Sequence, residues 1–427
     1  MAGSGIGGRS PCGWSISGRL GILVTTLLVL SACWSTDRDS STDGDGDSES
    51  VGRLTITGAG ATFPFPIYSR WFSIYSRDHP VRINYQSIGS GGGIRQMIEG
   101  TVDFGATDAP LTEEDLDRIP GTLSIPTVLG AVVLTYNLPD MARSLRLDGE
   151  IIAGIFLGEI TRWRDPRILV LNPDVEIPDR DIIPVHRSDG SGTTYVFTDY
   201  LHEISPAWRT RVGRGNAVRW PTGLGARGNE GVTGQVRQSP GAIGYVEQVF
   251  ARQNNLPMAD VRNRRGQFVA PSIEATTLAA SGLAERIPDD DDFRLSIVDA
   301  DTDGAYPIAS WTYLLIAPHY RDCNRGRAIL EVIRWALLER ADDVRDLNYA
   351  PLTLEIRVRA LNALKAVTCG TDERPIFDPD RDFMAEAIGE AEAPELEIEI
   401  DGEPEPEADS LPPSELEAGA DLDGRQH

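Results

Sequence analysis

Three stretches of this chain share one local pattern, in which a β-rich run is followed by a cluster of Gly, Ser and Thr and then by a helix-like run. They are residues 54–68, 82–100 and 182–201. Each stretch places hydroxyl side chains and backbone N–H groups where a helix begins. The start of a helix leaves about four N–H donors unpaired and carries roughly half a positive charge. Such an end binds anions. Because Asp108 and Arg187 lie close to these stretches in sequence, the pattern predicts an oxyanion held by several helix starts.

Strand and helix patterns alternate along the chain, which predicts an α/β architecture. A length of 427 residues exceeds one ordinary hydrophobic core, so two lobes are expected. Two long apolar runs, residues 125–136 and 305–318, are suited to carry the chain between the lobes and back. We therefore expect lobe 1 to comprise residues 53–130 and 306–376, and lobe 2 to comprise residues 131–305.

The N-terminal segment has the pattern of an export signal. Arg9 and Arg19 precede an apolar run at residues 20–30 that is too short to span a membrane as a stable helix. Cys33 follows directly after small residues, which resembles a bacterial lipobox. We expect residues 1–32 to be a signal peptide and Cys33 to be acylated, so that the mature protein is anchored to a membrane. The alternative is ordinary signal cleavage with an unmodified Cys33.

Both ends of the mature chain have the composition of solvated segments. Residues 33–52 are rich in Ser, Asp and Gly, which predicts a flexible, lipid-anchored linker. Residues 377–427 are strongly acidic and predict a disordered tail, with a docking segment as the alternative. The net charge of −25 argues against nucleic acid as a partner.

Two cysteines remain once export and acylation are taken into account, namely Cys323 and Cys369. Both flank helix-like stretches of an exported protein, and an oxidising compartment favours a disulfide between them. Their spacing does not suit a metal site.

Known catalytic and cofactor patterns do not occur in the sequence. The single lysine, Lys365, does not close a glycine-rich loop as a P-loop requires, and neither glycine cluster has the third glycine of a dinucleotide fingerprint. The histidines have no spacing that would hold zinc. Ser191 lies between Gly190 and Gly192 but without the GxSxG spacing of a hydrolase. We therefore expect no enzyme activity, catalytic residue, cofactor or metal; a secreted phosphoryl-transfer enzyme is the alternative.

Six segments, in order, resemble the phosphate-binding proteins of bacterial high-affinity phosphate ABC importers. They are GAGATFPFPIY, NYQSIGSGGG, VDFGATDAPLT, HRSDGSGTTYVF, WPTGLGARGNEGV and SPGAIGYVE, within a similarity that runs from about residue 54 to about residue 367. The resemblance implies a type II periplasmic-binding-protein fold with two lobes, each a mixed sheet flanked by helices, and a ligand in the interlobe cleft. It also implies that Thr62, Phe63, Ser90, Asp108, Arg187, Ser191, Gly192 and Thr193 line the site.

The same resemblance implies an extracytoplasmic receptor on the periplasmic or cell-surface face of the cytoplasmic membrane. Such a receptor binds inorganic phosphate and delivers it to the permease subunits of an ABC importer, and a monomer is expected.

Two of the implied ligand residues define the chemistry. Asp108 as a carboxylate only accepts hydrogen bonds, so it requires a ligand that still carries a proton, as phosphate does near neutral pH and sulfate does not. Arg187 supplies a charged fork, which Asp189 can restrain by a salt bridge. The alternatives are a helix-cap or turn role for Asp108 before Pro110 and a surface ion pair for Arg187. Arsenate or another protonated oxyanion is the alternative ligand.

Overall fold

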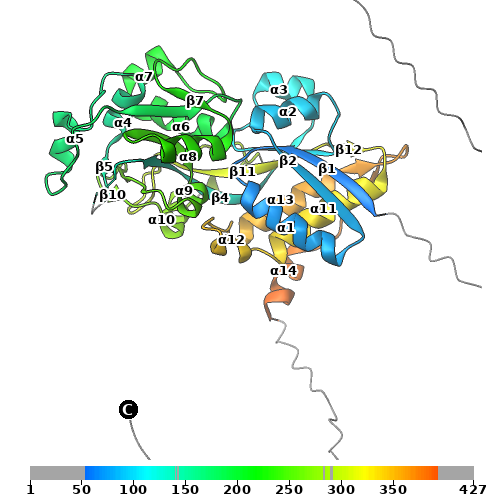
Figure 1. The fold of residues 1–427 in the computed structure, drawn as a ribbon. Helices are drawn as coiled ribbons and strands as arrows, with labels where there is room; N and C mark the ends of the chain where they lie inside the picture. Colours follow the sequence, from blue (N-terminus) through cyan, green and yellow to red (C-terminus); the bar gives the residue numbers. More distant parts are fainter. Residues whose placement is uncertain (1–52, 140, 142–143, 282–283, 289–291, 393–427) are drawn as a thin grey trace, which may run out of the picture. The chain divides into compact units, whose positions relative to one another are not determined.

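Strands and helices alternate along the chain, as the sequence pattern predicted (Figure 1). The computed structural model describes residues 53–392 except 140, 142–143, 282–283 and 289–291. The strands are β1 (Leu54–Gly60), β2 (Val81–Ser87), β3 (Phe104–Thr107), β4 (Leu123–Tyr136), β5 (Arg146–Leu147), β6 (Ile183–Arg187), β7 (Leu224–Ala226), β8 (Ala242–Glu247), β9 (Asp260–Arg262), β10 (Phe268–Val269), β11 (Ala309–Ile316), β12 (His319–Tyr320), β13 (Thr368–Cys369) and β14 (Arg374–Pro375). The α-helices are α1 (Phe65–Asp78), α2 (Ser90–Ile98), α3 (Glu113–Arg118), α4 (Gly149–Phe156), α5 (Pro166–Leu171), α6 (Gly192–Ile204), α7 (Pro206–Arg211), α8 (Gly228–Gln238), α9 (Gln248–Gln253), α10 (Ile273–Ala279), α11 (Cys323–Leu338), α12 (Asp343–Asp346), α13 (Leu354–Ala363) and α14 (Phe383–Glu392), with short 3-10 helices η1 (Ala284–Arg286) and η2 (Leu364–Ala366).

One sheet of eight strands, in the order β2-β1-β3-β11-β4-β8-β6-β7, runs through the structure. We call β2, β1 and β3 with their helices lobe 1, and β8, β6 and β7 with theirs lobe 2. The fold is thus α/β with two lobes flanked by helices, as predicted. The sheet is mixed, because β4 and β11 run antiparallel to their neighbours, but the two lobes share this one sheet rather than having one each. The signal peptide, Cys33 and the linker at 33–52 lie outside the described residues, as does the end of the acidic tail at 393–427.

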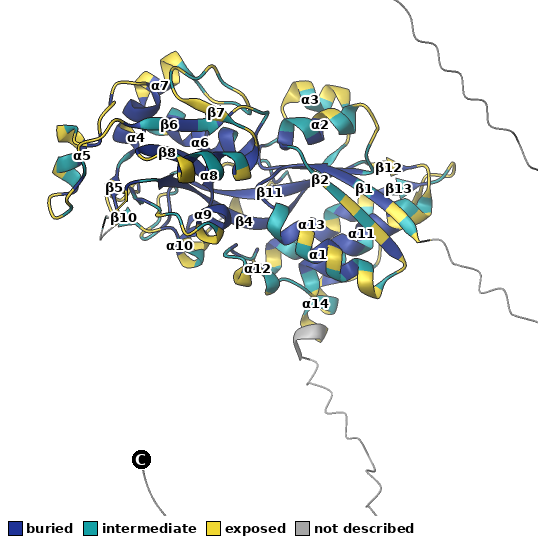
Figure 2. Cartoon of the chain, viewed as in Figure 1, coloured by how far each residue is buried: buried dark blue, intermediate teal, exposed yellow. Residues whose placement is uncertain are grey.

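The long strands β4 and β11 join the two groups of strands. β11 pairs antiparallel with residues 123–131 of β4, and β8 pairs antiparallel with residues 132–136 of the same strand. Every residue of β11 and nearly all of β4 are buried, so these strands appear dark in Figure 2. Strands that are buried on both faces read as continuous apolar runs, which explains the two long runs in the sequence.

Lobe 1 has the parallel strands β1, β2 and β3 at its centre. Helix α1 follows β1 after a short turn that contains Pro64, with Pro66 near its N-terminus, where a proline is tolerated because its missing N–H would be unpaired anyway. One face of α1 buries the apolar side chains of Ile67, Trp71 and Tyr75, four residues apart, and this face packs against the core.

Lobe 2 has the parallel strands β8, β6 and β7. Helix α6 follows β6, and helix α8 follows β7, each after a short loop. Helices α1 and α2 stand in the same relation to β1 and β2 in lobe 1. Helix starts therefore lie at the carboxyl ends of parallel strands in both lobes, which is where ligands bind in open α/β sheets.

The C-terminal part of the described chain extends further than expected. The sequence predicted a disordered tail from residue 377, whereas Phe377 and Phe383 are buried against each other, with ring centroids 5.4 Å apart, and α14 continues to Glu392. The guanidinium of Arg381 lies over both rings. The predicted start of the tail was therefore wrong, because the acidic bias of the segment hides two aromatic anchors.

The other C-terminal elements are held by a cross-link. The Sγ atoms of Cys323 and Cys369 form a disulfide, which joins the start of α11 to the small sheet of β12, β13 and β14. Within the described ranges, no helix combines the length and the apolar character that crossing a bilayer requires.

Candidate functional site

Four helix starts, those of α1 and α2 in lobe 1 and of α6 and α8 in lobe 2, meet where the lobes touch. Several hydrogen bonds cross between the lobes here. The N–H of Gly91 donates to the carbonyl of Gly190 over 3.0 Å, and the N–H of Gly192 donates to Oγ of Ser90 over 3.0 Å. A third runs from Asn229 Nδ2 in lobe 2 to Thr62 Oγ1 in lobe 1, over 2.8 Å. The eight residues that the sequence predicted to form one site, Thr62, Phe63, Ser90, Asp108, Arg187, Ser191, Gly192 and Thr193, are all buried at or next to these contacts.

Asp108 follows β3 and is 2% exposed. Its Oδ1 accepts a hydrogen bond from the Thr312 hydroxyl over 2.8 Å, and its backbone N–H donates to Ser90 Oγ over 3.3 Å. Burial raises the pKa of the Asp108 carboxyl to about 7, although the hydrogen bond from Thr312 and the positive charge of Arg187 act in the opposite direction. The N-cap of the following helix α3 is Thr112, so the alternative that Asp108 caps that helix is wrong.

Arg187 ends β6 and has a side chain that is 1% exposed. Its Nε and Nη2 donate to the two carboxylate oxygens of Asp189 over 2.8 and 2.6 Å, which confirms the predicted salt bridge. Its Nη1 lies 3.4 Å from Thr193 Oγ1. The alternative of a surface ion pair is therefore wrong, because Asp189 holds a buried guanidinium in one orientation beside the start of α6.

Helix α6 brings three predicted residues to the site. Ser191 is its N-cap, and the Ser191 Oγ accepts a hydrogen bond from the N–H of Thr194 over 3.0 Å. Because the oxygen accepts, the hydroxyl hydrogen is left to donate. Gly192 and Thr193 are the first helical residues, whose N–H groups have no acceptor within the helix.

The Phe63 side chain belongs to the hydrophobic core. The ring is buried in the core, with its centroid 6.4 Å from that of Tyr349, and the Tyr349 hydroxyl donates to the carbonyl of Phe63 over 2.6 Å. These contacts fix the turn between β1 and α1, which carries the Thr62 hydroxyl and the N–H of Phe63.

Sequence reasoning missed two side chains at this place. Thr312, on β11, contacts the Asp108 carboxyl, and Asn229, at the start of α8, contacts Thr62 and Thr193. Asn229 lies within one of the six segments that carry the resemblance, residues 220–232, but nothing in the local pattern distinguished it from a turn residue.

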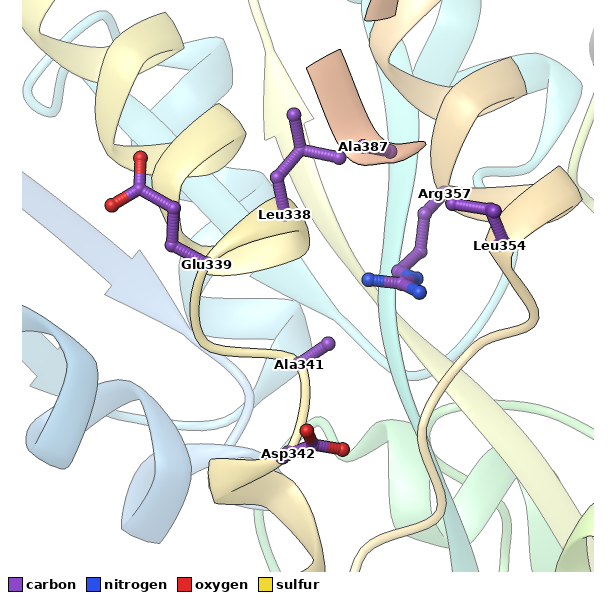
Figure 3. A pocket seen from close by; sticks show the side chains of 7 residues that line it. All are labelled: Leu338, Glu339, Ala341, Asp342, Leu354, Arg357 and Ala387. Atoms are coloured by element: carbon purple, nitrogen blue, oxygen red, sulfur yellow. The ribbon is translucent and has the colours of Figure 1, made fainter. Parts of the chain in front are cut away.

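A cavity of about 160 Å³ reaches Asp108 from one side, and its lining includes Tyr195, Arg214, Arg294 and Ser310. The pocket of Figure 3, about 610 Å³, is separate from the site: its lining comes from α11, α13, α14 and the loop at residues 339–342, and includes none of the eight predicted residues. Among the residues that the structure describes, no group of three or more His, Cys, Asp or Glu side chains could hold a metal ion.

Comparison with known proteins gives consistent results. A model of the PBP superfamily domain matches residues 40–340. Phosphate-binding protein PstS of Pasteurella multocida is 42% identical over 303 residues, 71% of this chain and 87% of the relative. PstS of Xylella fastidiosa is 41% identical over 300 residues, 70% and 82% of the two chains. Phosphate-binding protein PstS3 of Mycobacterium bovis is 33% identical over 366 residues, which cover 82% of this chain and 97% of the relative.

Solved structures resemble this fold. A phosphate-binding protein from Stenotrophomonas maltophilia has a TM-score of 0.56 at 21% identity, over 73% of this chain and 94% of its own. A high-affinity periplasmic phosphate-binding protein, solved with phosphate bound, has a TM-score of 0.57 at 19% identity. The match covers 71% of this chain and 92% of that protein. At such identities the likeness concerns the fold, and it agrees with the two lobes described above. The sequence relatives and the family model show that the chain belongs to the PstS family of phosphate-binding proteins, within the PBP superfamily.

Proposed function

We propose that this protein is a receptor that binds inorganic phosphate between its two lobes and delivers it to the permease of an ABC importer. The observation that carries the proposal is one buried carboxyl, Asp108, among hydroxyl and N–H donors at several helix starts. The donors match an oxyanion, and the carboxylate matches the proton that phosphate keeps near neutral pH. The names of the PstS relatives support the same ligand.

Each predicted residue has a role in this proposal. The guanidinium of Arg187 supplies charge, and Asp108 accepts from the ligand's hydroxyl group. The remaining donors are the hydroxyls of Thr62, Ser90, Ser191 and Thr193 and the N–H groups of Phe63 and Thr193. The N–H of Gly192, which donates to Ser90 Oγ in this structure, exchanges that partner for the ligand. A buried anion needs partners for all of its oxygens, because an unpaired charge away from water costs several kcal/mol.

We propose binding without catalysis. Ser191 is the residue that most resembles a nucleophile, yet its Oγ accepts from the N–H of Thr194 as a helix cap. A serine nucleophile requires an adjacent base to take its proton. The contacts of Ser191 fit a binding role.

The topology of the mature protein is also a proposal. Residues 1–32 act as a signal peptide, and an acylated Cys33 anchors the protein to the outer face of the cytoplasmic membrane. The folded part acts as a monomer, with residues 53–130 and 306–376 in lobe 1 and residues 131–305 in lobe 2. The pairing of β4 with β11 and then with β8 supports a crossing near residue 131.

Isothermal titration calorimetry of the full mature chain with phosphate, arsenate and sulfate tests the ligand. We expect one phosphate per chain, and no measurable binding of sulfate near neutral pH. Arsenate should also bind, because it shares the shape and protonation of phosphate. If phosphate gives no heat of binding while sulfate does, the proposed function is wrong.

A further inference from the structure

Asn229 joins the two lobes through its side-chain amide. It lies in the first turn of α8 and is fully buried. Its Nδ2 donates to Thr62 Oγ1 of lobe 1 over 2.8 Å and to Thr193 Oγ1 of lobe 2 over 3.2 Å. Both hydroxyls belong to the proposed phosphate site, whereas Asn229 is not among its proposed ligands.

The orientation of this amide is determined by its other end. The backbone N–H of Glu247 donates to Asn229 Oδ1 over 3.1 Å. A backbone N–H cannot accept, so the amide oxygen must face Glu247 and the NH₂ group must face the two threonines. Burial also raises the pKa of the Glu247 carboxyl well above its ordinary range.

The amide in turn determines what the two hydroxyls can do. A hydroxyl has two acceptor positions and one hydrogen. Thr62 Oγ1 accepts from Nδ2 of Asn229 and lies 3.4 Å from its backbone N, while Thr193 Oγ1 accepts from Nδ2 and from Arg187 Nη1. Both acceptor positions of each hydroxyl are thus engaged, and each hydrogen remains free to donate to a ligand.

We propose that Asn229 is a positioning residue that makes the Thr62 and Thr193 hydroxyls donors to the anion and thereby directs the anion's own proton to Asp108. Neither threonine can accept that proton while Asn229, together with Arg187 at Thr193, occupies its lone pairs. The carboxylate of Asp108 can accept it. This inference rests on the proposed phosphate function and adds a determinant of how the ligand is oriented.

Asn229→Leu removes the amide group but keeps a side chain of similar volume. We expect the phosphate affinity to fall about tenfold, because this is the typical effect of losing a well-placed hydrogen-bond network. Asn172→Leu is the matched control, because Asn172 is also a buried asparagine of lobe 2. Its side chain makes three hydrogen bonds, all to the backbone of Arg146 and Ile168. Both variants should melt at lower temperature, but only Asn229→Leu should change the phosphate Kd.

A double-mutant cycle separates positioning from general damage. In a Thr62→Val, Thr193→Val background there are no hydroxyls to orient, so adding Asn229→Leu should change the Kd by less than about twofold. If the full loss persists in that background, or if Asn229→Leu binds phosphate as tightly as the parent, the proposal is wrong. A parent chain that does not bind phosphate would instead overturn the proposed function.

Asn229→Asp provides a second variant that keeps the shape of the side chain. One carboxylate oxygen can still accept from the N–H of Glu247, but the other can only accept where the NH₂ group donated, so the threonine hydrogens would turn away from the ligand. We expect a loss of phosphate affinity larger than that of Asn229→Leu, partly recovered at lower pH as the new carboxyl is protonated. Phosphate binding equal to the parent at pH 8 would contradict the proposal.

Discussion

The backbone N–H of Gly192 donates to Oγ of Ser90 over 3.0 Å, and so joins the start of α6 in lobe 2 to the start of α2 in lobe 1. The contact leaves no space for a side chain at this position. A Cβ atom on Gly192 would lie 2.6 Å from both Ser90 Oγ and Asp108 Oδ2. The site in this arrangement therefore depends on the close approach of two helix starts from different lobes.

Gly192→Ala should prevent this approach and weaken phosphate binding by at least about tenfold, since a misplacement of about 1 Å in a site of this kind is costly. Gly234→Ala is the matched control: it lies in helix α8 of the same lobe, and a Cβ there meets nothing within 4 Å. The phosphate Kd of both variants should be measured by calorimetry. Equal affinities in the two variants would show that the lobes need not meet at Gly192.

Asp108→Asn should weaken the discrimination between phosphate and sulfate. The amide can donate where the carboxylate could only accept, so a fully deprotonated anion no longer meets an unpaired acceptor. Discrimination of this type is strong because a mismatch leaves buried polar groups without partners. Competition titrations of sulfate against phosphate measure the ratio of the two dissociation constants. If this ratio is the same in the variant and in the parent, Asp108 does not determine the selectivity.

The raised pKa of Asp108 also predicts how stability depends on pH. The carboxyl titrates near pH 7 in the folded protein and near its ordinary value of 3.8 when unfolded. Between these values the folded state holds a proton that the unfolded state has lost, so the free energy of unfolding falls as pH rises. The loss from pH 5 to pH 8 should be up to about 3 kcal/mol.

Urea unfolding of the phosphate-free protein at several pH values measures this dependence. The Asp108→Asn variant has no titrating group at this position and should show a shallower decrease than the parent over the same pH range. Parallel curves for the two proteins would mean that Asp108 has an ordinary pKa in the folded state.

Arg187→Ala should cost about 2–5 kcal/mol of phosphate binding, the range for truncating one partner of a buried charge pair. Part of the loss comes from leaving the partly buried Asp189 carboxylate without its cation. Arg162→Ala is a suitable control, because the side chain of Arg162 is 51% exposed and its salt bridges with Asp179 and Asp181 lie on the surface. A Kd for Arg187→Ala within threefold of the parent would contradict the proposed role.

Cys33→Ser should release the protein from the membrane fraction and leave its phosphate affinity unchanged. The hydroxyl cannot take the thioether-linked lipid, and the polar residues that follow have no affinity for a bilayer. Fractionation combined with mass spectrometry of the mature N-terminus measures both the location and the modification. An unmodified terminus at another residue of the parent chain would identify a secreted receptor instead.

Several parts of the site could be predicted because their signals are local. A strand, a glycine cluster and a helix follow one another within about 20 residues, so the starts of α1, α2 and α6 are visible in the sequence. Arg187 and Asp189 are separated by one residue, so a short loop brings them together. The apolar runs that became β4 and β11 were visible for the same reason.

Which helix starts carry donors, and which carboxyl accompanies them, can be predicted from the amino-acid sequence, because these properties depend on neighbours along the chain. The distant groups that complete the site come together only when the chain folds. Thr312 contacts Asp108 across 204 positions, and Asn229 contacts Thr62 across 167. The burial that raises the pKa of Asp108, and the packing of Phe377 and Phe383 that extends the folded part to Glu392, likewise follow from which surfaces meet in space. Local patterns carry no information about such contacts, since they depend on how the strands of the sheet are ordered.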